Sequence, residues 1–197
     1  PGLARERQGG RFREAALEAG VALTENGKPV SGMGAAAGDY DNDGRPDLLM
    51  TALPGETFPL FRNSGGGIFR EMTYASGLGA LTARLGGWGV AMADFNNDGI
   101  LDVAAAASHV TDNIETFSHE RYRQPVKVFA GSSPGVFHDD SARSGPALQP
   151  LRAHRGLVAA DLDHDGRLDL IVTALGEPAR LLRNVSPQAG SYVHLRL

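Results

Sequence analysis

Asp39-Tyr-Asp41-Asn-Asp43-Gly44-Arg45-Pro-Asp47 is the first of three nine-residue stretches that share one pattern; the others run from Asp94 to Asp102 and from Asp161 to Asp169. We refer to them as loops 1, 2 and 3. Oxygen-bearing side chains at positions 1, 3, 5 and 9, with Gly at position 6, suit a hard cation that takes about six to eight oxygen ligands. Carboxylates packed this closely repel each other unless an ion lies between them. The pattern therefore predicts one calcium site in each loop.

The EF-hand loop begins in the same way but also requires a bidentate Glu at position 12 and a helix on each side. Position 12 is Met50, Ala105 or Val172 in the three loops. Downstream of each loop lies a short apolar run, which is typical of a buried strand rather than a helix. Each loop is therefore predicted to form the tip of a β-hairpin, with position 9 opening the second strand.

The same order of segments recurs around each loop, which predicts a repeat protein. A Gly- and Ala-rich strand runs into the loop, an apolar strand leaves it, a third strand ends in a turn, and an aromatic-led strand follows. The aromatic-led strands are predicted at Phe12-Arg-Glu14, Phe69-Arg-Glu71 and Phe137-His-Asp139. Four short strands per unit are the content of one β-propeller blade. We expect an all-β fold of about three four-stranded propeller blades.

The predicted blades span approximately residues 33–73, 88–141 and 155–197, with an additional outer strand near residues 10–15. Loops 2 and 3 are farther apart than loops 1 and 2 because residues 108–124 interrupt the middle strands of the second blade. A long loop on a rigid scaffold either contacts a partner or is an uninformative surface excursion. The sequence leaves both interpretations open.

The formal net charge of −4 reflects the loops, because they contain eleven of the 23 acidic residues. Outside the loops, basic residues outnumber acidic ones, and no run of Lys or Arg indicates nucleic-acid binding. Heavy use of Arg and Ala favours a bacterial source. The chain has no Cys, and no apolar run approaches the roughly 20 residues that span a bilayer.

The compartment is predicted from the cation. Sites without the Glu at position 12 are expected to bind calcium more weakly than intracellular sensors, and extracellular modules bind in roughly the 10⁻⁴–10⁻³ M range. We therefore expect the protein to be secreted, periplasmic or attached to the cell surface.

The phrases Gly38-Asp-Tyr-Asp-Asn-Asp-Gly-Arg-Pro-Asp47 and Gly87-Trp-Gly-Val-Ala-Met-Ala-Asp94 resemble FG-GAP/VCBS repeats. That family builds integrin-α-like seven-bladed propellers with calcium in a loop between the first two strands of a blade. The phrases Leu60-Phe-Arg-Asn63 and Gly190-Ser-Tyr-Val-His-Leu-Arg-Leu197 are similar to the ASPIC/UnbV (cartilage acidic protein-like) group. The resemblance implies a seven-bladed propeller, of which this chain would form a sector.

The resemblance also implies the calcium ligands, by side chain at positions 1, 3, 5 and 9 and by backbone carbonyl at position 7. Loop 2 has Asn96 at position 3 where the other loops have Asp, so on charge alone we expect it to bind calcium most weakly. The implied ligands are Asp39, Asp41, Asp43, Arg45 and Asp47 in loop 1, Asp94, Asn96, Asp98, Ile100 and Asp102 in loop 2, and Asp161, Asp163, Asp165, Arg167 and Asp169 in loop 3.

Three blades cannot close a ring, so we expect a fragment of a longer protein, a part of one, or copies that assemble. An open sector exposes sheet faces and strand edges. Of these alternatives, a fragment or a part of a longer protein is favoured.

No hydrolase elbow, zinc-protease motif or phosphate-binding loop is present, so we expect no enzymatic activity. His109 and His119 in the insertion are interpreted as solvated, Asp139-Asp140 as a strand edge, and Trp88 as packing between blades. The favoured function is a calcium-stabilised scaffold that binds a protein partner or a cell-surface component. The alternatives are a carbohydrate-binding or carbohydrate-cleaving propeller, and an accessory subunit docked in a larger assembly.

Overall fold

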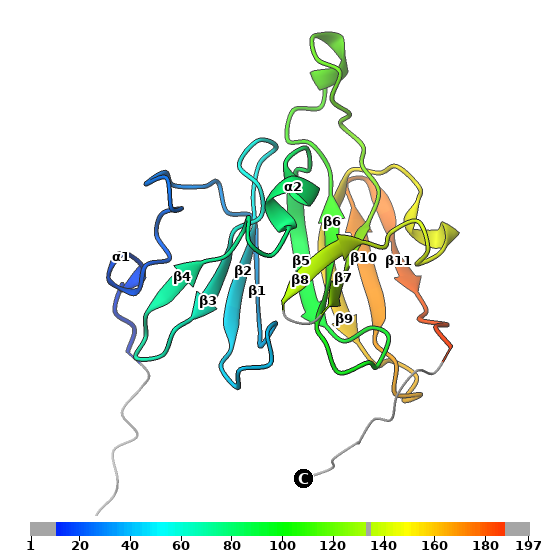
Figure 1. The fold of residues 1–197 in the computed structure, drawn as a ribbon. Coiled ribbons are helices and arrows are strands. Elements are labelled where there is room, and N and C mark those ends of the chain that lie inside the picture. The colour runs from blue at the N-terminus through cyan, green and yellow to red at the C-terminus, as the bar shows by residue number, and fades with distance from the viewer. Residues whose placement is uncertain (1–10, 133–134, 188–197) are drawn as a thin grey trace, which may run out of the picture.

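A computed structural model of the chain describes residues 11–132 and 135–187. Within them lie three antiparallel sheets, placed side by side as successive blades (Figure 1). The few helices are short and lie in connections between strands. The predicted all-β fold of propeller-type blades is confirmed.

The first two sheets each contain four strands in sequential order, and the third contains three strands among the described residues. The first comprises β1 (Gly34–Gly38), β2 (Asp47–Thr51), β3 (Leu60–Asn63) and β4 (Phe69–Glu71). The second comprises β5 (Gly87–Ala93), β6 (Asp102–Ala107), β7 (Lys127–Ser132) and β8 (Val136–Asp139). The third comprises β9 (His154–Ala160), β10 (Asp169–Ala174) and β11 (Glu177–Leu182).

Each acidic loop is the tip of the hairpin between the first two strands of its sheet. The residue before the loop pairs with the residue at position 9: Gly38 with Asp47, Ala93 with Asp102, and Ala160 with Asp169. Position 9 is thus the first residue of a strand in all three sheets. The loops are held at equivalent positions because they close equivalent hairpins.

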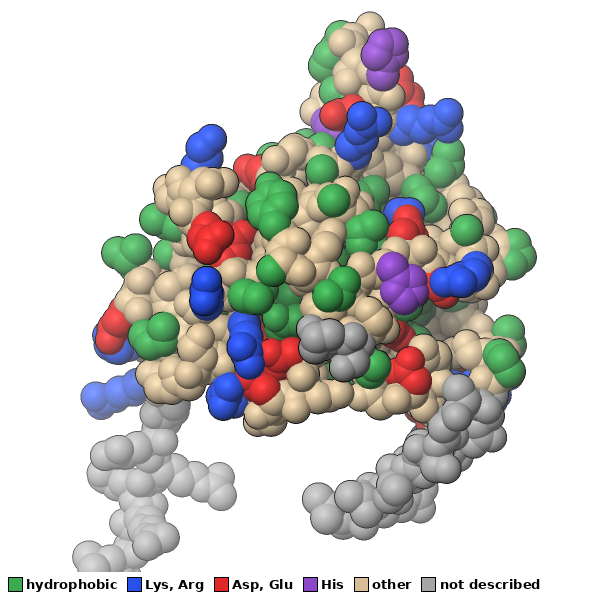
Figure 2. Space-filling view, in the orientation of Figure 1, with side chains coloured by type: hydrophobic (Ala, Val, Ile, Leu, Met, Phe, Trp, Pro, Cys, Tyr) green, Lys and Arg blue, Asp and Glu red, His purple; other side chains and the backbone are tan. Residues whose placement is uncertain are grey.

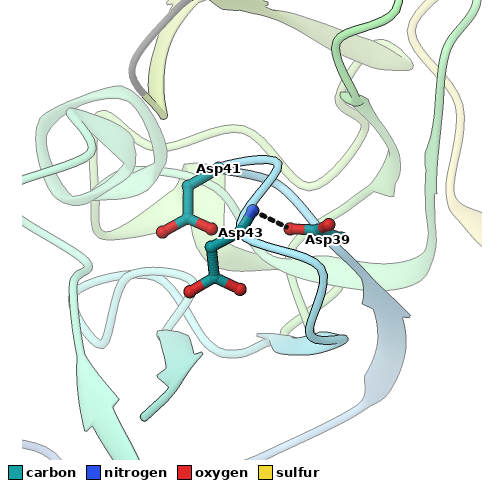
Figure 3. A group of neighbouring side chains, drawn as sticks. All are labelled: Asp39, Asp41 and Asp43. Atoms are coloured by element: carbon teal, nitrogen blue, oxygen red, sulfur yellow. Dashed lines mark hydrogen bonds between the residues drawn. The ribbon is translucent and has the colours of Figure 1, made fainter.

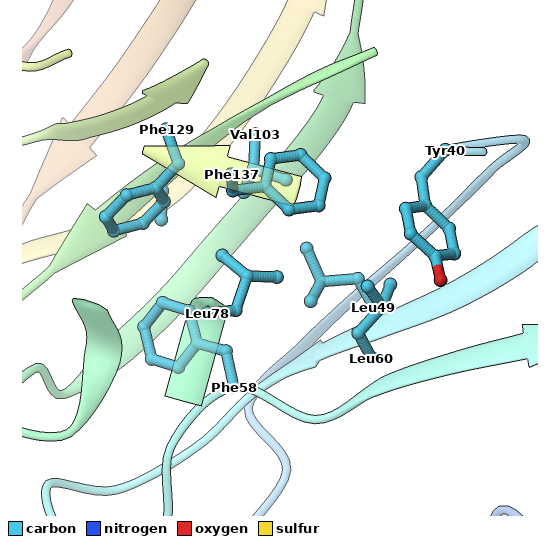
Figure 4. Close-up of a cluster of buried hydrophobic side chains, with 9 residues drawn as sticks. Tyr40, Leu49, Phe58, Leu60, Leu78, Val103, Phe129 and Phe137 are labelled. Atoms are coloured by element: carbon cyan, nitrogen blue, oxygen red, sulfur yellow. The ribbon is translucent and has the colours of Figure 1, made fainter. Parts of the chain in front are cut away.

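The central strand β6 shows how the sheets stack, because every one of its residues is buried. Val103 and Ala105 belong to a core shared with the first sheet, whereas Ala104 and Ala106 belong to a core shared with the third. Alternate residues of a strand point to opposite faces, so one strand supplies both interfaces. Figure 4 shows the first of these cores, where Phe129 and Phe137 approach Leu78 and Tyr40.

The Gly- and Ala-rich first strands lie against one another, which explains their composition. A Cβ atom on Gly34 would lie 2.0 Å from the carbonyl oxygen of Trp88, and one on Gly89 would lie 2.2 Å from the amide nitrogen of Leu157. No side chain fits at such distances. The smallest residues are therefore required where β1, β5 and β9 approach each other.

The strand predicted near residues 10–15 does not form in the described part of this segment. Residues 11–15 have no regular structure, Phe12 is fully exposed, and helix α1 (Ala16–Ala19) follows. An aromatic-led strand needs a neighbouring strand to pair with, and none of the described strands pairs with this segment. The end of the third predicted blade, residues 188–197, lies outside the described residues.

Short helical segments complete the connections between sheets: α2 (Leu78–Thr82) between the first and second, and η2 (Pro146–Leu148) between the second and third. Leu78 and Leu148 each enter the adjacent core. The insertion at residues 108–124 contains η1 (Ile114–Thr116) and projects from the upper end of the second sheet (Figure 1). Across the described residues, no helix has the length and hydrophobicity needed to cross a bilayer.

Candidate metal site

All three acidic loops lie at the same end of the molecule, opposite the projecting insertion (Figure 1). This follows from the topology, since each loop joins the first strand of a sheet to the second. Any cation held by the loops would therefore lie along one edge of the stacked sheets.

The first Asp of each loop closes it from within by accepting two backbone N–H groups. Asp39 Oδ1 accepts from the amide of Asp43 at 2.9 Å, and Asp39 Oδ2 accepts from the amide of Gly44 at 2.8 Å. Asp94 and Asp161 make the same pair of bonds in their loops. Gly44 has a φ of +85°, and the Gly at position 6 of the other loops has nearly the same value, which only Gly adopts readily. The pattern thus fixes the turn locally.

The turn gathers the acidic side chains of loops 1 and 3. Asp39, Asp41 and Asp43 place one carboxylate oxygen each within 4.8 Å of one another (Figure 3). Asp161, Asp163 and Asp165 do the same in loop 3. Clustered carboxylate oxygens are the donor set that Ca²⁺ prefers.

Loop 2 has the same backbone but a different side-chain arrangement. Asn96 Nδ2 donates to Asp98 Oδ2 at 2.9 Å, and Asn96 Oδ1 accepts from the Asp98 amide at 3.0 Å. An amide thus occupies the place of the second carboxylate and reduces the repulsion on Asp98. The Asn carbonyl oxygen is itself a ligand type that Ca²⁺ accepts.

The Asp at position 9 is buried and accepts one amide from near the end of the third strand of its sheet and, in loops 1 and 2, one from position 2 of its own loop. Asp47 Oδ1 accepts from the Asn63 amide at 2.7 Å, and Asp47 Oδ2 accepts from the Tyr40 amide at 3.2 Å. Asp102 accepts from the amides of Gly131 and Phe95 at 2.9 and 3.1 Å. The structure therefore brings positions 1, 3 and 5 together, and position 9 also joins the loop to the sheet.

Two carboxylate oxygens test whether the loops fit a cation. Asp41 Oδ1 and Asp169 Oδ2 are buried and have no hydrogen-bond partner. Asp169 is only 3% exposed, and its Oδ2 has no hydrogen-bond partner. The equivalent oxygens of Asp47 and Asp102 each accept a backbone amide. A buried carboxylate oxygen without a donor is unfavourable unless a positive charge meets it. Both oxygens therefore fit a bound cation.

The surroundings move the pKa values of the loop acids in opposite directions. Burial raises the pKa of the Asp43 carboxyl. Hydrogen bonds from the Arg62 side chain and the Arg45 amide, together with the positive charges of both arginines, lower it by more, so the pKa is lowered overall. Burial raises the pKa of Asp102 to about 6; amide hydrogen bonds from Gly131 and Phe95 oppose this. At position 9 of loop 1 burial likewise raises the pKa of Asp47, so the two position-9 acids shift in the same direction.

Position 4 links one loop to the next, a role that the sequence did not reveal. Asn42 Nδ2 donates to the carbonyl of Gly99 at 3.0 Å, and Asn97 Nδ2 donates to the carbonyl of Gly166 at 3.1 Å. Both Asn residues have a positive φ, near 57°, which Asn tolerates better than most residues. The loops therefore form one hydrogen-bonded row across the three sheets.

Guanidinium groups also reach the acidic clusters, and these too were not predicted. Arg62, on β3, places Nε 2.5 Å from Asp41 Oδ2 and Nη2 2.9 Å from Asp43 Oδ2. The side chain of Arg45, predicted only as a carbonyl ligand, turns back to pair with Asp43. The recurrence of Arg before Asn63 and Asn184 was the available signal, since it places an Arg beside loops 1 and 3.

The remaining candidate residues have structural partners. The ring of Trp88 lies under the guanidinium of Arg155, 4.0 Å from ring centroid to Cζ, and Trp88 Nε1 donates to the Ser108 carbonyl. In the insertion, His109 is buried rather than solvated as predicted, and its Nε2 lies 3.1 Å from Glu120 Oε2. The carboxylates of Asp139 and Asp140 pair with Lys127 and Arg143, respectively.

Comparisons with known proteins agree with the repeat seen in the structure. Residues 31–67 and 155–195 match a family model described as the FG-GAP repeat, and residues 52–105 match one described as an FG-GAP-like repeat. The matched segments include all three acidic loops.

The chain is also similar to cartilage acidic protein 1 from three vertebrates. It is 27% identical over 146 residues to the Xenopus tropicalis protein, which covers 73% of this chain and 20% of the relative. It is 25% identical over 220 residues to the Mus musculus and Homo sapiens proteins, which covers 87% of this chain and 33% and 32% of the relatives. The chain thus spans between a fifth and a third of the length of these relatives.

Proposed function

The chain belongs to the FG-GAP-repeat proteins, and from that premise we propose that it is a non-enzymatic scaffold whose three acidic loops hold structural Ca²⁺. In this proposal the scaffold works outside the cytosol and presents surfaces to a protein partner or a cell-surface component. The repeated loop geometry carries the proposal, because three hairpin tips arrange oxygen donors in the same way.

The side chains at positions 1, 3, 5 and 9 would hold the ion, together with the carbonyl oxygen at position 7. A bound Ca²⁺ would neutralise the gathered carboxylates. The unpartnered oxygens Asp41 Oδ1 and Asp169 Oδ2 support this assignment. Asp47, Asp102 and Asp169 would join each loop to the third strand of its sheet, so that fixing a loop also fixes the blade.

An apolar row on the third sheet supports a larger propeller. Ile171 pairs with Val158 on one side and Leu181 on the other, and these three side chains are 36%, 58% and 53% exposed. The equivalent residues of the first sheet include Leu49 and Leu60, which the second sheet buries completely. We propose that residues 1–197 form one propeller segment and that a further blade covers this row in the whole protein.

The insertion at residues 108–124 supports an interaction role. It projects from the end opposite the acidic loops, and Figure 2 shows its charged and histidine side chains at the tip. The His109–Glu120 pair and a bond from the His109 amide to the Tyr122 carbonyl brace its base. Phe117 is 68% exposed on this braced segment. An ordered projection with an exposed aromatic ring is suited to protein contacts.

Thermal unfolding with EDTA and with about 2 mM Ca²⁺ tests the calcium proposal, because a ligand that binds only the folded state raises the melting temperature. We expect a Ca²⁺-specific increase that 2 mM Mg²⁺ does not reproduce, since Mg²⁺ demands a smaller octahedral site. Equal melting temperatures in EDTA and Ca²⁺ would refute the proposal.

Paired variants separate the loops from general charge effects. Asp41→Ala and Asp163→Ala remove one gathered carboxylate from loops 1 and 3, and each is expected to reduce the calcium-dependent increase. Asp112→Ala is the matched control, because Asp112 is exposed in the insertion at the opposite end. A similar reduction in the control would show that calcium acts through overall charge.

A further inference from the structure

The three acidic loops differ in whether they contain their own positive charges. In loop 1, Arg62 bridges Asp41 and Asp43, and Arg45 pairs with Asp43. In loop 3, Arg183 Nη2 lies 3.0 Å from Asp163 Oδ2, and Arg167 pairs with Asp165. Each of these loops therefore has two guanidinium groups against four aspartates. Figure 2 shows acidic and basic side chains adjacent at the lower end of the first sheet.

Loop 2 has no such counter-charge among the described residues. The amide of Gly131 contacts Asp102 as that of Asn63 contacts Asp47, so Ala130 occupies the position of Arg62. At position 7, Ile100 replaces Arg45. The described ion pairs include none to Asp94, Asp98 or Asp102.

Counting both signs of charge reverses the order expected from the acids alone. Four aspartates and two arginines leave loops 1 and 3 with a net −2 each, whereas three aspartates without an arginine leave loop 2 with −3. Loop 2 therefore retains more uncompensated negative charge, although it has one acid fewer.

We propose that Arg62 and Arg183 are built-in counter-ions that hold loops 1 and 3 in shape without metal, so that the calcium dependence of folding is concentrated in loop 2. This inference rests on the proposed calcium binding and adds to it which loop responds and which residues set the response. The arginines act as positioning residues, because they contact the carboxylates and not the ion.

The pairing geometry allows an arginine and a cation to share one carboxylate. Arg62 contacts Oδ2 of Asp41, whereas Oδ1 of the same carboxylate is buried and unpartnered. The Asp41 side chain is 13% exposed and the Arg62 side chain is 40% exposed, so solvent is excluded mainly from the carboxylate end of the pair. A group that pairs with a metal ligand without touching the metal orients that ligand, here the Asp41 carboxylate. The arginine therefore holds the carboxylate in place and leaves the other oxygen available.

Removing the counter-ion should make loop 1 behave like loop 2. For Arg62→Ala we expect the melting temperature in EDTA to fall by about 2–4 °C, and the melting temperature in 2 mM Ca²⁺ to stay within about 1 °C of the unmodified protein. Arg183→Ala should do the same through loop 3. Arg84→Ala is the matched control, because Arg84 is exposed and its side chain is in none of the described ion pairs.

A transplant tests the inference in the opposite direction and does not depend on the stability of the Arg62 variant. Asn96→Asp combined with Ala130→Arg and Ile100→Arg gives loop 2 the four aspartates and two arginines of loop 1, and Ala130 lines a cavity of about 360 Å³ that has room for the longer side chain. We expect most of the difference in melting temperature between EDTA and Ca²⁺ to disappear, since loop 2 carries most of the calcium dependence.

The outcomes separate this inference from the calcium proposal. No response to Ca²⁺ in the unmodified protein refutes calcium binding itself. A normal response there, with Arg62→Ala lowering both melting temperatures equally, shows that Arg62 only supports the fold and overturns the inference. An unchanged calcium response in the transplant also overturns it. A larger response in Arg62→Ala and a smaller one in the transplant support it.

Discussion

Loops 1 and 2 have the same backbone and different electrostatics. In both, the first Asp accepts the amides of positions 5 and 6, and the last Asp accepts an amide from the third strand. Loop 1 adds two guanidinium groups, and loop 2 substitutes an amide side chain for one carboxylate. The comparison shows that a repeated motif fixes loop shape, whereas neighbouring residues set how much negative charge the loop retains.

The largest expected effect comes from removing the Asp at position 9, which accepts two backbone amides in both loop 1 and loop 2. Asp47→Ala leaves two amides without their acceptor, and we expect it to cost about 4 kcal/mol in the free energy of unfolding. Burial raises the pKa of both acids, and the shift is larger at Asp102, where the pKa reaches about 6; Asp102→Ala should therefore cost less, because the ionised form that it removes is less favourable. Urea denaturation in EDTA at pH 7.5 measures both. A larger loss at Asp102 would contradict the electrostatic difference between the loops.

His154 sets the pH range in which the loops can be compared. It is fully buried, and burial lowers its pKa to about 4; the charges of Arg180 and Arg152 act in the same direction, and the Pro150 carbonyl opposes them. Arg152 is itself paired with Glu177. The folded-state pKa of His154 lies below the ordinary value of about 6.5, so the unfolded state takes up a proton first as the pH falls. The free energy of unfolding is therefore unaffected by His154 above pH 6.5 and decreases as the pH falls from 6.5 to about 4. We expect a loss of about 3 kcal/mol across this window.

Thermal unfolding from pH 8 to pH 4 checks this expectation. His154→Gln should flatten the part of the curve between pH 6.5 and 4, and His138→Gln, at an exposed position, should leave it unchanged. An unchanged curve in His154→Gln would assign acid sensitivity to other groups.

Adding the missing carboxylate to loop 2 sharpens the comparison. Asn96→Asp replaces the Asn96–Asp98 hydrogen bond with repulsion between two carboxylates, and no arginine is present to offset it. We expect a loss of about 1 kcal/mol in EDTA and a tighter calcium affinity. Urea denaturation and calorimetric titration with Ca²⁺ measure the two effects. A gain of stability in EDTA would mean that loop 2 already has a counter-charge.

The smallest expected effect comes from exchanging position 7 between loops. Arg45→Ile removes a pair to Asp43 whose arginine side chain is 43% exposed, and Ile100→Arg introduces the equivalent pair to Asp98. Partly exposed ion pairs contribute about 0.5 kcal/mol, so each change should alter stability in EDTA by about that amount, in opposite directions. Both effects should diminish in 1 M NaCl. Changes of the same sign would indicate packing effects at Ile100.

The fold was largely predictable because its signals are local. Alternating short strands, turn residues and three acidic loops predicted three blades, and the sheets contain hairpins at the expected places. The predicted strand at Phe12 was wrong for a non-local reason. Residues 12–14 have the same Phe-Arg-Glu sequence as β4, but β4 has β3 as a partner, whereas none of the described strands pairs with Phe12.

The sequence by itself determined the shape of the acidic loops, because the bonds that close them connect residues at most five positions apart. Only the tertiary structure decided their charge balance and their connections. Arg62 reaches Asp43 from 19 residues away, and Asn42 reaches Gly99 from 57 residues away. Such contacts depend on which strands and loops lie side by side. The two-residue period of a strand shows which face a side chain points to, but not which residue it meets there. Local turn geometry is therefore present in the motif, whereas the partners of its carboxylates depend on the assembled sheets.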